Sequence, residues 1–171
     1  MKIGILSDSH FKSDYTKEVI DLLKAKGSEY LIHAGDLCME ENLKHLEKSG
    51  LIYVSVFGNN DMSLIPLSNK YKIKQEPYFF KIKETTFKLM HLPYYMTGDC
   101  DVVISGHTHI FESEYNNGTL FINPGEVCAR EKPKIECVLL EINDNEYIIN
   151  YYSRNINEKE FVKKEIKYER K

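Results

Sequence analysis

Side chains that can bind metal ions gather in five short clusters, each directly after a run of apolar residues. Because open α/β sheets bind ligands at the carboxyl ends of their strands, we expect the clusters to meet at one edge of a sheet. The candidate ligands are Asp, His and Asn without Cys, which favours divalent cations of intermediate hardness. The clusters are Asp8-Ser9-His10, Gly35-Asp36, Gly58-Asn59-Asn60-Asp61, His91 and Gly106-His107-Thr108-His109.

Most of these clusters are weak signals when taken alone. Asp8 with His10 fits a capping carboxylate beside a surface histidine, and Gly35-Asp36 or Asn59 fits an ordinary turn. The two histidines around Thr108 are more specific, because paired imidazoles at a strand end rarely serve a core. The conjunction of all five clusters predicts a metal site. Seven ligands are more than the four that one tetrahedral ion can bind, and they suit two ions that share a carboxylate.

The charges of such a site favour an anionic substrate. Two divalent cations bring four positive charges, of which Asp8 and Asp36 offset two and a bound hydroxide offsets a third. A phosphate is therefore attracted. Metal binding also lowers the pKa of bound water towards neutrality, which supplies a nucleophile. The residues predict hydrolysis of a phosphoester.

An alternation of strands and helices in the first half of the chain must position these clusters. Apolar runs at 2–6, 30–33 and 51–57 predict buried strands, and helical spacing of apolar residues predicts helices over 14–26 and 40–48. This order predicts a parallel sheet with right-handed crossovers.

The second half favours short strands with little helix between them. We expect strands joined by hairpins at Asn116-Asn117-Gly118 and Asn143-Asp144-Asn145. A mixed sheet or two packed sheets follow, with helices mostly from the first half. The expected strands are 71–75, 78–82, 86–91, 102–105, 110–115, 119–122, 134–142 and 146–152.

Composition bounds the class of protein. The chain has 171 residues, 42% hydrophobic residues and a net charge of −3, which favours one globular domain and argues against stable nucleic-acid binding. Its start is a strand rather than a signal peptide, and no apolar run approaches the ~18 residues of a membrane span. We expect a soluble cytoplasmic protein. The scattered cysteines are expected to be reduced and to form no zinc site.

We divide the chain into a main domain over 1–154 and a charged C-terminal extension over 155–171. A short helix, an edge strand and a mobile tail all fit the extension, and its mixed charges favour a solvated terminus.

Together the clusters resemble the motifs of the calcineurin-like metallophosphoesterases, and most closely their small single-domain phosphodiesterase branch. The similarity runs from Lys2 to about Tyr152 and includes the stretch from Phe121 to Gly125. It implies a four-layer α/β/β/α sandwich with mixed sheets. It also implies that one ion is held by Asp8, His10 and His109, the other by Asn59, His91 and His107, and that Asp36 bridges them beside a nucleophilic hydroxide. Mn²⁺ or Ni²⁺ is favoured, with Fe, Zn²⁺ and Co²⁺ left open.

Asn60 departs from the family pattern. Many relatives have a histidine there that can protonate the leaving group, whereas an amide can only hydrogen-bond a phosphate oxygen. This favours good leaving groups and diesters over unactivated monoesters, and argues against a DNA-repair nuclease. We assign Asn60 and Asp61 to the catalytic machinery, with Asp61 orienting the site through hydrogen bonds.

A second departure follows His91, where relatives have a crossover helix and this chain has only a short segment, 92–100. We expect a loop there, and Tyr94 and Tyr95 either line the site or pack the loop. His33 is either a partner of a ligand or an ordinary strand-end histidine. Arg130 fits a surface position better than a phosphate contact.

These expectations combine into a two-metal phosphodiesterase acting on a small phosphodiester or nucleotide-like substrate, without a membrane or nucleic-acid partner. A homodimer is left open. The alternatives are a phosphomonoesterase and a non-catalytic protein-interaction scaffold of the same fold, as in a eukaryotic retromer subunit. Retention of all seven ligands favours catalysis.

Overall fold

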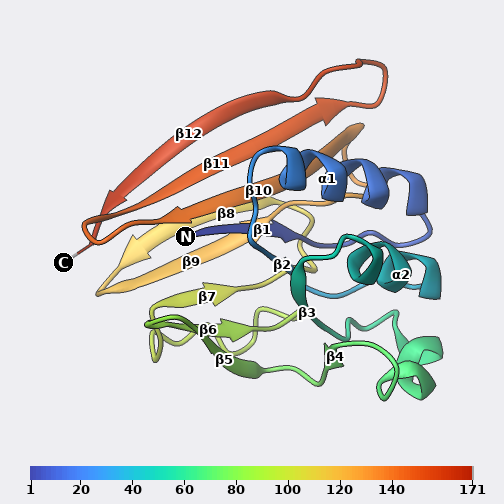
Figure 1. Ribbon diagram of the computed structural model, residues 1–171, viewed down its shortest axis with the longest axis horizontal. Coiled ribbons are helices and arrows are strands. Elements are labelled where there is room, and N and C mark those ends of the chain that lie inside the picture. Colours follow the sequence, from blue (N-terminus) through green and yellow to red (C-terminus); the bar gives the residue numbers. More distant parts are fainter. Residues whose placement is uncertain (171) are drawn as a thin grey trace.

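Two stacked β-sheets form the body of the protein in the computed structural model, which describes residues 1–170 (Figure 1). The larger sheet has the strand order β12-β11-β10-β1-β2-β3-β4, and the smaller has the order β5-β6-β7-β9-β8. Parallel and antiparallel pairs occur in both. The expected α/β class with mixed sheets is confirmed.

Most element boundaries agree with the sequence predictions. The helices are α1 (Ser13–Ala25), α2 (Glu40–Lys48) and the 3-10 helix η1 (Met62–Leu67). The strands are β1 (Lys2–Leu6), β2 (Tyr30–His33), β3 (Ile52–Val56), β4 (Ile73–Lys74), β5 (Tyr78–Ile82), β6 (Thr85–Leu89), β7 (Val102–Ile104), β8 (Phe111–Asn116), β9 (Thr119–Pro124), β10 (Lys134–Ile142), β11 (Glu146–Asn155) and β12 (Val162–Glu169). The strand expected at 71–75 is reduced to two residues.

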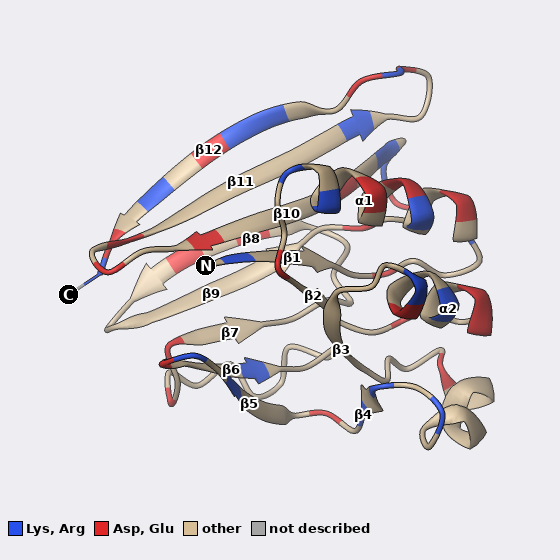
Figure 2. Cartoon of the chain, viewed as in Figure 1, with Lys and Arg blue, Asp and Glu red and all other residues tan. Residues whose placement is uncertain are grey.

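Helices α1 and α2 are the crossovers of the first half, and they pack on the outer face of the larger sheet. Leu23 of α1 and Leu46 of α2 are buried in that layer, and a second apolar layer fills the space between the sheets. Figure 2 shows Lys, Arg, Asp and Glu concentrated on the helices and outer strands, while β2, β3 and β7 carry none. None of the helices described has the length and apolar character to cross a membrane.

A loop, and not the helical layer of the expected four-layer sandwich, lies over Lys88 on the outer face of the smaller sheet. The segment between β6 and β7 contains no helix within the described chain, as its length predicted. Lys88 on β6 is buried beneath this loop, and its ammonium group donates to the Thr97 carbonyl at 2.8 Å and lies 2.5 Å from Asp99 Oδ1. These contacts fix the loop to the sheet.

Replacing Lys88 by alanine should lower the free energy of unfolding by about 2–3 kcal/mol, because hydrogen bonds to charged groups contribute about 1.5–3 kcal/mol each. Urea denaturation measures the change. Lys81→Ala is the matched control, since Lys81 pairs only with the exposed Glu84 and its loss should cost under about 0.5 kcal/mol. Equal effects of the two substitutions would contradict the anchoring role.

The C-terminal residues correct one prediction. A solvated terminus was the favoured interpretation, but residues 162–169 form β12, which pairs with β11 along its whole length. Ile166 and Tyr168 face the layer between the sheets, and the Tyr168 hydroxyl donates to the Ser113 carbonyl on β8 at 2.8 Å. Alternating charged residues hid this period-two pattern in the sequence. The edge-strand alternative is the correct one.

Candidate metal centre

The structure brings the seven predicted ligands together at the carboxyl ends of β1, β2 and β3 in the larger sheet and of β6 and β7 in the smaller sheet. The clusters therefore meet where the two sheets lie against each other, and not at the edge of one sheet as expected. Asp36 lies in the middle, with its Oδ2 atom 3.6 Å from His10 Nε2 and 3.4 Å from His91 Nε2. On one side, Asp8 Oδ1 is 3.2 Å from His109 Nε2. On the other, Asn59 Oδ1 is 2.9 Å from His91 Nε2 and 3.1 Å from His107 Nδ1. The side chains thus form two neighbouring groups joined through Asp36.

Burial differs between the two groups. Asp8, His10, Asp36, His91 and His109 are buried, whereas Asn59 and His107 are exposed at the mouth of the site. Burial lowers the pKa of His10, which favours the neutral imidazole that binds metals. Burial opposes ionisation of Asp36 as well, but hydrogen bonds from His91 and Asn60 outweigh it and hold the pKa of that carboxyl well below its usual range.

The ligand loops have an unusual backbone. Residues with positive φ cost free energy and cluster at functional sites. Five of the seven candidate ligands have φ between 45° and 69°, namely Asp8, His10, Asp36, His107 and His109. Each of these residues lies two to five positions after the end of β1, β2 or β7, in the loop where the chain turns away from its strand. The surrounding fold must supply the free energy that this backbone costs.

Two glycines let the loops approach one another. A Cβ atom on Gly58 would lie 2.2 Å from Asp36 Oδ1, and one on Gly106 would lie 2.2 Å from Ser7 Oγ. Real side chains do not approach so closely, so only glycine fits at these positions. The glycine that begins the third cluster and the glycine that begins the fifth therefore each have a steric cause.

Unsatisfied polar atoms support a cation in this space. Asp8 Oδ1 and His10 Nε2 are buried and have no hydrogen-bond partner within residues 1–170. Buried polar atoms of this kind are costly unless something pairs with them. The carboxylate, imidazole and amide donors around them suit a divalent ion of intermediate hardness. The residues present fit a metal ion.

The comparison with known proteins agrees with this geometry. The sequence profile of the calcineurin-like phosphoesterase superfamily domain matches residues 1–145. The chain belongs to this superfamily.

A relative at 30% identity places the chain in the small phosphodiesterase branch, and solved structures show the same fold. A phosphodiesterase of Methanocaldococcus jannaschii is 30% identical over 142 residues, covering 75% of this chain and 86% of the relative. The probable metallophosphoesterase YsnB of Bacillus subtilis is 26% identical over 168 residues, covering 92% of this chain and 94% of the relative. The crystal structure of a single mutant of Vps29 from Entamoeba histolytica superposes with a TM-score of 0.78 at 23% identity, covering 98% of this chain and 99% of the Vps29 chain. The predicted family and its two-sheet sandwich are confirmed.

Asn60, where many members of the superfamily have histidine, is held beside Asp36. Its backbone N–H donates to Asp36 Oδ1 at 2.9 Å and its side-chain amide donates to Asp36 Oδ2 at 2.7 Å. Asn60 is exposed, and both hydrogen bonds that it donates within the described residues go to Asp36, which leaves the second hydrogen of its amide group available.

Asp61 and His33 hold the ligand loops together from behind. The Asp61 carboxylate accepts from the Cys38 N–H at 2.6 Å and the Gly58 N–H at 2.7 Å, which joins the second and third clusters. His33 is fully buried, and burial lowers its pKa to about 3. Its Nδ1 accepts from the Gly35 N–H, so its Nε2 donates to Ser9 Oγ at 2.8 Å. Neither partner is itself a candidate ligand, so His33 contacts no ligand directly and instead links the loop of the first cluster to that of the second.

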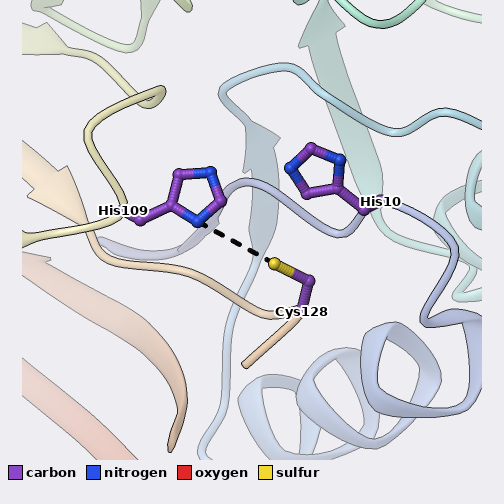
Figure 3. A group of neighbouring side chains, drawn as sticks. All are labelled: His10, His109 and Cys128. Carbon is purple, nitrogen blue, oxygen red and sulfur yellow. Dashed lines mark hydrogen bonds between the residues drawn. The ribbon is translucent and has the colours of Figure 1, made fainter. Parts of the chain in front are cut away.

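Sequence reasoning missed Cys38, Glu126 and Cys128, which lie behind the ligands. Figure 3 shows Cys128 next to the His10 and His109 rings, with its sulfur 3.9 Å from His109 Nδ1. Cys38 Sγ is 3.3 Å from His10 Nδ1. Burial raises the pKa of both thiols, which keeps them protonated. Their scattered spacing gave no indication that they would meet the site.

Residues at the rim are more exposed. Tyr94 and Tyr95 are 74% and 58% exposed, so neither tyrosine packs tightly in its loop. Arg130 is exposed, as predicted, and lines a pocket of about 410 Å³ together with His107, His109 and Ile110. A basic group therefore borders the site on the side of the fifth cluster.

Proposed function

We propose that this protein is a two-metal phosphodiesterase that hydrolyses a small phosphodiester or nucleotide-like substrate. The observation that carries the proposal is the buried pair Asp8 and Asp36, surrounded by histidines, with Asp8 Oδ1 and His10 Nε2 left without hydrogen-bond partners. The relationship to a phosphodiesterase of Methanocaldococcus jannaschii supports the same reaction class.

The ligand assignment follows the two groups. Asp8, His10 and His109 would hold one ion, Asn59, His91 and His107 the other, and Asp36 both, with Mn²⁺ or Ni²⁺ favoured. When bound, two such ions supply a nucleophile at neutral pH and neutralise charge on the attacking and leaving oxygens. Asp36 lies between the groups and would fix their separation. Asp61 accepts hydrogen bonds from the loops of the second and third clusters and so fixes their relative position.

Asn60 favours diesters as substrates. Its amide keeps one donor on Asp36 and has a second hydrogen free for a phosphate oxygen, but it cannot protonate a leaving group. General acid catalysis contributes about 10²–10⁴-fold. Without it, substrates whose leaving group departs unprotonated should react best.

A protein-interaction scaffold is the second candidate, and one observation favours it. Large apolar side chains that are more than half exposed lie close to the ligands in sequence, namely Phe11, Met62, Tyr94, Tyr95 and Ile110. Large exposed apolar side chains are a feature of interaction sites where they form a continuous patch, so their number near the ligand loops keeps the scaffold as the second candidate. The same side chains also suit the apolar ester groups of a substrate.

Hydrolysis of bis-p-nitrophenyl phosphate and p-nitrophenyl phosphate separates these functions. We expect metal-stripped protein to be inactive, and protein reloaded with Mn²⁺ or Ni²⁺ to hydrolyse the diester faster than the monoester. Asp36→Asn should lower kcat for the diester by at least about 10²-fold, because even changes behind a metal ligand cost about 10–100-fold.

Asp144→Asn is the control, since Asp144 lies in the β10–β11 hairpin, remote in sequence from every cluster. It should leave the activity unchanged. Activity on the monoester alone would replace the proposal with a phosphomonoesterase. Inactivity on both esters despite bound metal would favour the scaffold.

A further inference from the structure

Glu126 is a buried carboxylate directly behind a candidate metal ligand. It is fully buried at the end of β9, and its Oε2 atom accepts the Nδ1–H of His109 at 2.7 Å. His109 Nε2 points the other way, towards Asp8 Oδ1. The carboxylate therefore fixes which nitrogen of His109 carries a proton and leaves Nε2 as the donor atom for a metal.

The Glu126 carboxylate is itself held in place by several donors. Its oxygens accept backbone N–H groups from Arg130, Glu131 and Lys132 at 2.8–3.1 Å and the Cys128 thiol at 3.1 Å. An ionised carboxylate can accept all of these hydrogen bonds, because its two oxygens offer about four acceptor positions. Glu126 is thus a fixed negative charge with one oxygen aimed at His109.

The other buried histidines have weaker partners on their far nitrogens. His91 Nδ1 faces the Ala34 carbonyl at 2.8 Å, and His10 Nδ1 faces the neutral Cys38 thiol at 3.3 Å. Within the described residues, only His109 is backed by a carboxylate in this way. A carboxylate partner increases the basicity of a ligating imidazole more than a neutral one does. The two groups of ligands are therefore chemically unequal.

We propose that Glu126 is a positioning residue that makes the metal position formed by Asp8, His10 and His109 the tighter of the two. The inference rests on the ligand set of the proposed function. It predicts that metal ions bind in two steps and that the first step depends on Glu126. The second position, with Asn59, His91 and His107, does not depend on it.

Calorimetric titration of metal-stripped protein with Mn²⁺ tests this proposal. We expect two binding steps in the unaltered chain, and Glu126→Gln should weaken the tighter step by about 10–100-fold while leaving the weaker step unchanged. Glu131→Gln is the matched control, because Glu131 is an exposed neighbour of the same charge that pairs with Arg130. It should leave both steps unchanged.

A measurement on the metal-free protein distinguishes a local effect of Glu126→Gln from misfolding of the variant. Long-range ¹H–¹⁵N spectra of the histidine rings should show the His109 Nδ1 signal displaced in Glu126→Gln, with the His91 signals unchanged. Equal weakening of both steps, or an unchanged first step, would overturn the inference and leave the phosphodiesterase proposal intact. A chain that binds no Mn²⁺ would overturn both.

Discussion

Gly58→Ala should abolish metal-dependent diester hydrolysis, with at least about a 10²-fold loss of kcat, since misplacing a catalytic group by ~1 Å can cost that much. The added methyl group would lie 2.2 Å from Asp36 Oδ1 and 2.3 Å from the Asp36 backbone nitrogen. Relief of this clash requires Asp36 to move, and Asp36 is the residue that joins the two ligand groups. Overpacking of this kind also costs about 1–3 kcal/mol of stability.

Gly98→Ala provides the comparison. Its added methyl group would approach no atom more closely than the Thr119 hydroxyl, at 3.1 Å, and Gly98 lies in the loop after β6 rather than in a ligand cluster. Steady-state kinetics on bis-p-nitrophenyl phosphate, with urea denaturation of both variants, measures the effects. Unaltered activity in Gly58→Ala would show that Asp36 is not fixed where the structure places it.

Binding of Mn²⁺ should raise the melting temperature strongly. The reason is that two atoms of the candidate ligands, Asp8 Oδ1 and His10 Nε2, are buried without a hydrogen-bond partner within residues 1–170 until a cation binds. A ligand present at 100 times its Kd stabilises the folded state by about 2.7 kcal/mol. For a domain of this size, each kcal/mol shifts the melting temperature by roughly 2–4 °C. We therefore expect an increase of roughly 5–10 °C for each ion.

Thermal melting followed by circular dichroism, with and without Mn²⁺, measures this shift. In Asp36→Asn the shift should be much smaller, because the residue placed between the two ligand groups has lost its charge. A melting temperature that stays constant up to millimolar Mn²⁺ in the unaltered chain would contradict the metal centre.

Much of the fold followed from the sequence because local patterns and ligand clusters agreed. Apolar runs that end in Asp, Asn or His marked the carboxyl ends of β1, β2, β3, β6 and β7 correctly. The C-terminal strand did not follow, since its inward residues Ile166 and Tyr168 alternate with lysines and glutamates. Its strand character comes from pairing with β11, which no local pattern shows.

The site was predictable in its ligands but not in what surrounds them. Cys38 and Cys128 reach the histidines only because the two sheets bring the second cluster and the turn after β9 together. Glu126 carried a weak indication, since an acidic residue directly after Asn123-Pro124-Gly125 follows a buried strand. Its role depends on the orientation of the His109 ring, which the sequence does not contain.

The position of β1 in the larger sheet has a consequence for how the protein matures. β1 lies between β2 and β10, and Ile5 pairs with Val138, so that most of the sequence separates the two residues. Contacts between such distant residues form slowly, because a long loop must close before they contribute. A nascent chain that has exposed all seven ligands still lacks β10. Metal loading should therefore be a late event that follows synthesis of nearly the whole polypeptide.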